Sequence, residues 1–139
     1  MGTSIHDNTL LGYEVDHRAR TIRLRTVFGE STAPDFTDAL FLGVVAYEFV
    51  HDSLETGTIL FSIDEEDAAA IVKENAAKFE SGRKYGWPGD WNSSLDAATQ
   101  YLMASKVKGF GIYSSLGLSG WVLAESLVYE SGRQQKTAG

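Results

Sequence analysis

Residues 11–28 read LGYEVDHRARTIRLRTVF, and this stretch predicts the type of fold. Apolar side chains alternate with polar or small ones over 11–16, which is the period of a half-buried β-strand. The alternation resumes over 21–28 after a short polar link. Two such runs predict an antiparallel hairpin. The residues expected to face inward are Leu11, Tyr13, Val15, Ile22, Leu24, Thr26 and Phe28.

Two further strands are predicted after this hairpin. Residues 39–50 are apolar on both alternating sets, which is typical of a central strand covered on both faces. Gly43 in the middle of this run indicates a bend or a bulge. Residues 59–63 alternate again, with Ile59, Phe61 and Ile63 expected to point into the core and Phe61 at the centre of that stripe.

Two helices are expected next. The first begins at Asp64 as its N-cap, because three more carboxylates follow where the helix dipole favours anions, and it ends near Gly82. The second begins at Ser93 and continues to about Lys106.

Two closing strands follow, over 110–114 and 121–129, and the second places Trp121, Leu123, Leu127 and Tyr129 on one side. The element order is therefore β-β-β-β-α-α-β-β. It predicts an α+β fold, mainly an antiparallel sheet of about six strands with two helices packed on one face. We expect a single domain over 5–130 and a flexible C-terminal tail over 131–139, which lacks apolar residues.

Composition restricts the classes of partner. The chain has 139 residues, 19 acidic and 12 basic, with a net charge of −7. This balance opposes nucleic-acid binding, which requires lysine and arginine against phosphate, and it suits a basic protein partner. The sequence has no cysteine and no apolar run long enough for a membrane span. We therefore expect a soluble cytoplasmic protein that binds neither nucleic acid nor membranes.

The sequence contains no recognisable catalytic motif, and we assign no catalytic residue and expect no cofactor. Neither the G-x-S-x-G nucleophile turn nor a phosphate-binding P-loop is present. Two His-Asp pairs, His6-Asp7 and His51-Asp52, would converge on a divalent metal if the first and third strands were neighbours. They support an alternative function as a small metal-dependent hydrolase. The more ordinary interpretation is that both aspartates shape turns.

Candidate binding residues come from two segments. The loop 85–91 is rich in aromatic residues, which dominate protein interfaces. We expect Trp87 to plug the core, and Tyr85 and Trp91 to be the binding candidates. Arg23 and Arg25 share the outward face of one strand and form the second candidate site, for a phosphate or an acidic partner.

A resemblance points in the same direction. The stretches HDNTLLGYEVD at 6–16, RTIRLRT at 20–26 and LGVVAYEF at 42–49 resemble small uncharacterised bacterial proteins. Some of these are proposed as immunity proteins of polymorphic toxin systems. The resemblance covers the first half of the chain and implies a short, acidic, non-enzymatic protein that blocks a toxin.

The leading hypothesis is therefore a non-catalytic protein-binding module that neutralises a toxin. The metal-dependent hydrolase is one alternative. A structural subunit that forms a homodimer through an exposed strand is the other.

Overall fold

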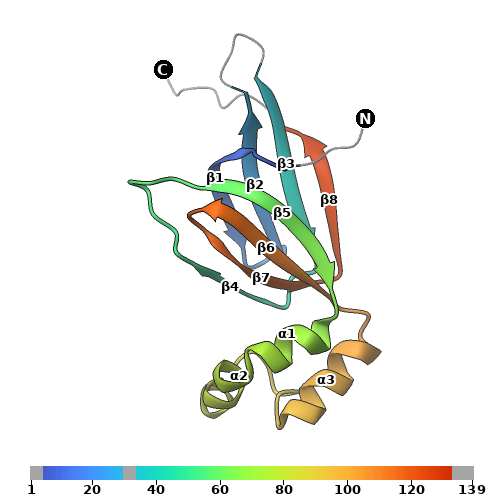
Figure 1. The fold of residues 1–139 in the computed structure, drawn as a ribbon. Coiled ribbons are helices and arrows are strands. Elements are labelled where there is room, and N and C mark those ends of the chain that lie inside the picture. The colour runs from blue at the N-terminus through green and yellow to red at the C-terminus, as the bar shows by residue number, and fades with distance from the viewer. Residues whose placement is uncertain (1–4, 30–33, 133–139) are drawn as a thin grey trace.

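The computed structural model describes residues 5–29 and 34–132. Within them the chain is α+β, with eight strands in one antiparallel sheet and three helices (Figure 1). The strands are β1 (Thr9–Asp16), β2 (Thr21–Phe28), β3 (Asp35–Leu42), β4 (Ala46–Val50), β5 (Ile59–Glu66), β6 (Lys108–Leu116), β7 (Ser119–Ala124) and β8 (Ser126–Ser131). The helices are α1 (Ala68–Glu74), α2 (Ala76–Gly82) and α3 (Leu95–Ala104), with a 3₁₀ turn η1 (Arg83–Tyr85) after α2. No helix in this part of the chain combines the length and apolar character needed to cross a membrane.

The sheet rolls up into a barrel. Its strand order is β4-β7-β6-β5-β1-β2-β3-β8, so β4 and β8 are formally its edges. However, β3 leads directly into β4 and β7 directly into β8, so the β3–β8 and β4–β7 pairings are two parts of one long ladder. This ladder brings the two ends of the sheet together and gives the barrel shape in Figure 1.

The predicted count of six strands is wrong because two long strands are each broken at a corner. The ladder is interrupted at Gly43, which has a positive φ of 63°, and opposite it at Glu125. The Glu125 N–H donates to the Leu42 carbonyl at 3.0 Å, which closes the corner. A Cβ at Gly43 would lie 2.6 Å from Cδ of Glu125, so the corner requires glycine. The bend that Gly43 indicated in the sequence is therefore present.

The corner also reverses which side the side chains face. Trp121 and Leu123 on β7 pack against the helices, whereas Leu127 and Tyr129 on β8 pack into the barrel. The prediction that all four share one side is wrong. At the corner residues 43–45 lie opposite only residues 124–125, and the alternation of β7 and β8 is offset by one there. The period of the sequence does not predict this offset.

The helices also differ from prediction. β5 continues to Glu66, because Glu65 and Glu66 pair with Phe110 and Gly109 of β6. The N-cap is therefore Asp67 and not Asp64, and its carboxylate accepts a hydrogen bond from the Ala69 N–H at 3.1 Å.

The single helix predicted up to Gly82 is instead two helices, α1 and α2, separated at Asn75. There the backbone leaves the helical region and the side-chain amide donates to the Ile71 carbonyl at 2.8 Å. α3 begins after Ser94, one residue later than predicted.

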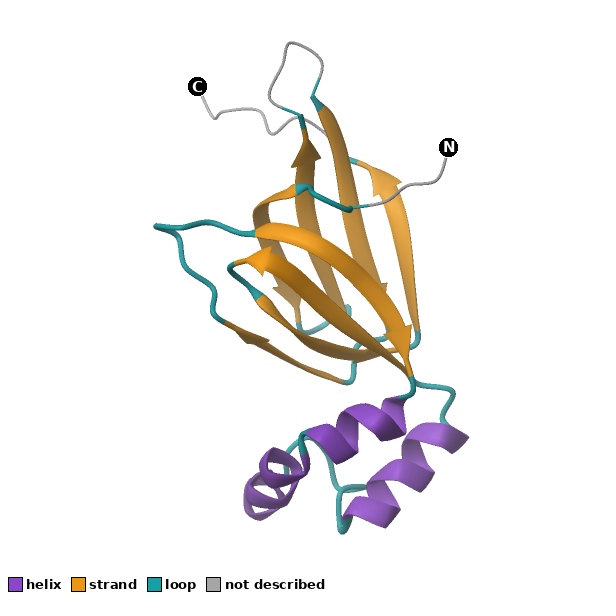
Figure 2. Ribbon diagram, in the orientation of Figure 1, coloured by secondary structure: helices purple, strands orange, loops and turns teal. Residues whose placement is uncertain are grey.

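Two clusters of buried side chains stabilise the molecule. One fills the barrel, where Phe41 of β3 meets Phe110 of β6 edge-on with ring centroids 5.5 Å apart. The other joins the helices to the outer side of β7, where Phe79 stacks on Trp121. The helices therefore lie at one end of the barrel (Figure 2), consistent with the prediction that they pack on one face.

The last strand extends one residue into the predicted C-terminal tail. Ser131, which was placed in the tail, belongs to β8, and the Gly132 N–H donates to the Phe36 carbonyl at 2.8 Å. The rest of the predicted tail, 133–139, lies outside the described residues.

The prediction that Phe61 lies in the core is wrong. The β5–β6 register shifts between Leu60 and Ser62, which leaves Phe61 as the extra residue of a β-bulge. Leu60 points into the barrel and is fully buried, whereas Phe61 is 52% exposed. Phe28, which was also expected to face inward, is 53% exposed at the end of β2.

The neighbouring residues Leu60 and Phe61 provide a direct test of this register. Leu60→Ala should lower the free energy of unfolding by about 3 kcal/mol, because it leaves a cavity in the barrel. Phe61→Ala should lower it by less than about 1 kcal/mol, because the ring is half in solvent. Urea denaturation of both variants measures the difference. A larger loss for Phe61→Ala than for Leu60→Ala would contradict the bulge.

Candidate functional site

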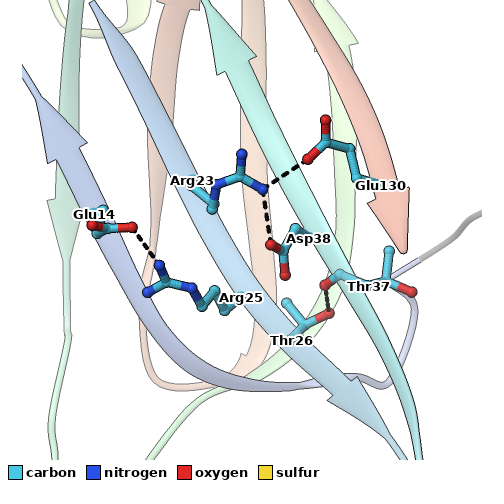
Figure 3. Close-up of polar contacts among 7 residues, drawn as sticks. All are labelled: Glu14, Arg23, Arg25, Thr26, Thr37, Asp38 and Glu130. Atoms are coloured by element: carbon cyan, nitrogen blue, oxygen red, sulfur yellow. Dashed lines mark hydrogen bonds and ion pairs between the residues drawn. The ribbon is translucent and has the colours of Figure 1, made fainter. Parts of the chain in front are cut away.

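The two candidate arginines lie on β2 and are held in ion pairs (Figure 3). Nη1 of Arg23 donates to Asp38 at 2.9 Å and to Glu130 at 2.8 Å. The hydrogen bonds to Glu130 and Asp38 raise the pKa of Arg23 above its usual value. Arg25 pairs with Glu14. Both guanidinium groups therefore connect β1, β2, β3 and β8 to one another, and a ligand would have to displace these carboxylates.

The three aromatic residues of the 85–91 loop have different environments. Tyr85 is 79% exposed. Trp91 is half-buried and stacks on Tyr101 of α3, with ring centroids 4.9 Å apart and planes 7° from parallel. Trp87 packs on Phe79 at 5.0 Å and joins the cluster between helices and β7, as a core plug would.

The two His-Asp pairs are used locally. Nδ1 of His6 lies 3.2 Å from the Asp7 carboxylate, and Asp52 accepts a hydrogen bond from the Tyr13 hydroxyl at 3.0 Å. The predicted metal site required the strand over 11–16 to lie beside the strand over 39–50. In this sheet β1 is instead flanked by β2 and β5. Within residues 5–29 and 34–132, no three histidine or carboxylate side chains form a group able to hold a metal ion.

A different feature forms the candidate site: an apolar surface on the outside of the barrel. Four large side chains from two paired strands remain between 38% and 52% exposed. We call this surface the outer β5–β6 face, and it consists of Ile59, Phe61, Tyr113 and Leu116. Contiguous exposed apolar side chains of this size mark interaction sites more often than scattered ones do.

Strand pairing places these side chains on the same side of the sheet. Ile59 lies directly opposite Leu116, and Ser62 directly opposite Tyr113, so each pair points to one face. The bulge turns Phe61 outward beside Ser62. The ring of His6 contacts Phe61 edge-on, with centroids 5.1 Å apart. The exposed face is thus fixed by the ladder itself.

Carboxylates border one end of this face. The Tyr113 hydroxyl donates to Glu66 at the end of β5. This hydrogen bond, burial, and the negative charges of Glu66, Glu74 and Asp64 raise the pKa of Tyr113 from 10.0 to about 12. Such a shift reports a negative electrostatic field at this end of the face. A Cβ at Gly111 would lie 2.7 Å from both the Tyr113 hydroxyl and Glu66, so a side chain at this position would have to displace these two groups.

No pattern in the sequence predicts this face. Ile59 and Phe61 fit the pattern of a buried stripe, and a bulge leaves no mark in a period-two alternation. Only the acidic run at 64–67 was visible, and it was interpreted as the start of a helix. The outer β5–β6 face combines an apolar centre with an acidic border, which suits binding of a macromolecule rather than catalysis.

The raised pKa of Tyr113 predicts a stability change at alkaline pH. Between pH 10 and about 12 the unfolded tyrosine loses its proton while the folded one keeps it, so unfolding becomes easier as the pH rises. Tyr113→Phe should reduce this decline, as measured by urea denaturation at successive pH values. Tyr85→Phe is the control, because the Tyr85 hydroxyl makes no hydrogen bond within the described residues. Identical declines in all three proteins would contradict the Glu66 contact.

Comparison with known proteins adds no relative to these observations. No family model, no curated protein and no solved structure matches the chain. The resemblance to bacterial immunity proteins therefore stays a prediction.

Proposed function

We propose that this chain is a non-catalytic module that binds a basic protein through the outer β5–β6 face. The observation that carries the proposal is Phe61, a large apolar side chain that the bulge holds half-exposed beside three others. Aromatic side chains at the centre of such a surface supply much of the binding energy of protein interfaces.

The charge distribution favours a basic partner. Asp64, Glu65 and Glu66 lie at the end of β5, near Tyr113. Among the described residues only Glu65 of these three approaches a lysine, Lys108, at 3.8 Å. The whole chain carries a net charge of −7. Opposite charge on a partner accelerates encounter and fixes its orientation, whereas desolvation of the apolar centre supplies affinity.

The same charges disfavour self-association through this face. Two copies would place their acidic borders against or near each other, and like charges across an interface cost free energy. A homodimer subunit is therefore the weaker alternative for this surface.

Toxin neutralisation is the more specific form of the proposal. A stoichiometric inhibitor needs no catalytic group, only a preformed surface that covers the partner's working site. A cytoplasmic location would suit this role, because a neutralising protein must meet the toxin where the toxin acts.

Site-specific photo-crosslinking tests the proposal. A benzoylphenylalanine is placed at Phe61 or, as the matched control, at Phe28, which is equally exposed at 53% but lies at the end of β2. In cells of the source organism, the Phe61 position should form an adduct with a basic protein, and the Phe28 position should not. Asp64→Lys should reduce the adduct, and Asp90→Lys, at an exposed position of the 86–91 loop, should not.

Three outcomes would contradict the proposal. Equal adducts at both positions would show that the contact is unspecific. An adduct only with a second copy of the chain would favour the homodimer. An acidic partner would remove the electrostatic argument.

A further inference from the structure

A cleft of about 510 Å³ lies between the barrel and the helices, apart from the outer β5–β6 face. One side is formed by the β1–β2 turn and by residues 44–47, which lead into β4 and form its first two residues. The other side is formed by the loop between η1 and α3 and by Tyr101 of α3. Clefts of this volume between two structural units are the usual location of small-molecule sites.

One wall of the cleft is aromatic. Trp87, Trp91 and Tyr101 line it from the helical side, and Tyr47 lines it from β4. Trp91 and Tyr101 are already stacked in parallel, so each ring holds the other in a fixed orientation. Flat aromatic surfaces of this kind favour stacking with a planar apolar ligand.

This wall is held in place by its own hydrogen bonds. The side-chain amide of Asn92, which is buried, donates to the carbonyls of Phe79 at 2.7 Å and Trp87 at 3.0 Å. Nε of Arg83 donates to the Asn92 carbonyl at 2.9 Å. Gly89 has no Cβ, which leaves room for the indole nitrogen of Trp91 against its backbone. The aromatic wall is therefore already ordered without a ligand, and binding loses little free energy in ordering it.

The barrel side of the cleft contains a cation. Arg20 lines it from the β1–β2 turn, together with His17, and Arg20 makes no ion pair within residues 5–29 and 34–132. Asp16 is the one carboxylate in the lining, and its Oδ1 accepts hydrogen bonds from the N–H groups of Arg18 at 3.0 Å and Ala19 at 2.9 Å. These two hydrogen bonds orient Oδ1 of Asp16 toward the backbone of the turn.

The backbone of Arg20 is itself unusual. Its φ is 57°, in the left-handed region that favours glycine. Its carbonyl accepts a hydrogen bond from the Val44 N–H at 2.8 Å. This bond joins the β1–β2 turn to the segment between β3 and β4. A charged residue thus occupies a conformation in which glycine would be less strained, and it does so on the edge of a cleft.

We propose that this cleft binds a small planar aromatic molecule that carries an anionic group. The ring packs against the aromatic wall of the cleft, and the anionic group lies beside Arg20 on the barrel side. The two chemical features of the ligand match these two parts of the lining. The site is independent of the proposed protein-binding face, because the two share no residue.

Titration with indole-3-acetate, followed by calorimetry and by NMR of ¹⁵N-labelled protein, tests the site. The chain has three tryptophans, so each indole N–H gives its own signal. We expect saturable binding that shifts the Trp91 signal and the backbone amides of residues 17–20. Indole, which lacks the carboxylate, and acetate, which lacks the ring, should each bind at least about tenfold more weakly, the loss expected for one charge-assisted hydrogen bond or one stacked ring.

Two matched variants assign the charge. Arg20→Gln should weaken indole-3-acetate binding about tenfold or more, because it removes the cation from the cleft. Arg18→Gln removes the same charge from the same turn outside the lining and should leave the affinity unchanged. Arg20→Gly should fold at least as stably as the parent, because glycine adopts the positive φ of this position without strain. It should bind indole-3-acetate as weakly as Arg20→Gln does, because it also lacks the cation.

The outcomes that would overturn the site are distinct from those of the crosslinking experiment. Equal loss in the Arg18 and Arg20 variants would show only a general effect of charge. Equal affinity for indole and indole-3-acetate would exclude an anion requirement. A phosphorylated aromatic probe that binds more tightly than indole-3-acetate would retain the site and assign phosphate as the anionic group. Phe61→Ala should leave all of these affinities unchanged, whatever partner binds the outer β5–β6 face.

Discussion

The long ladder between residues 35–50 and 119–131 is the interaction on which the rest of the structure depends. It joins the two ends of a sheet that would otherwise have two open edges, and open edges invite pairing with other chains. At the corner the two parts of the ladder stay connected because the Glu125 N–H donates to the Leu42 carbonyl. Gly43 has no side chain and leaves room there for the side chain of Glu125. On one side of this corner β8 completes the barrel core. On the other, β7 turns Trp121 and Leu123 outward, where they provide the surface on which the helices pack.

The sequence predicts the fold class because local periodicity and turn chemistry dominate most of the chain. Ile22 and Leu24 alternate with the arginines of β2 and are fully buried, as expected. The helices were located approximately because their apolar faces recur at helical spacing. What the sequence does not predict is where an extra residue shifts the register. The bulge in β5 and the register change at the corner between residues 43–45 and 124–125 are set by the pairing partners, and these lie far away in the chain.

The candidate site was missed for the same reason. Phe61 belongs to a stripe that would be buried in a regular strand, and only the register with β6 turns it to solvent. The residues chosen from the sequence lie elsewhere. The sequence predicts that Arg23 and Arg25 form a site for a phosphate or an acidic partner, but the carboxylates that pair with them come from β1, β3 and β8, which no local pattern places beside them. Trp91, another binding candidate from the sequence, lies in a loop rich in glycine and aromatic residues, which is a local feature, and it lines the proposed ligand cleft.

The position of the helices along the chain has a consequence for the order of folding. β5 and β6 form an extended pair in the sheet, and all three helices lie between them in sequence. The strands β1, β2 and β3 can meet through short connections, whereas closure of the barrel must wait until residues near the end of the chain reach β3 and β4. Contacts between such distant residues carry a large loop-closure entropy and slow the folding of a domain. During synthesis the first three strands therefore leave the ribosome long before β7 and β8 exist, with their apolar inner faces uncovered and in need of protection from other chains.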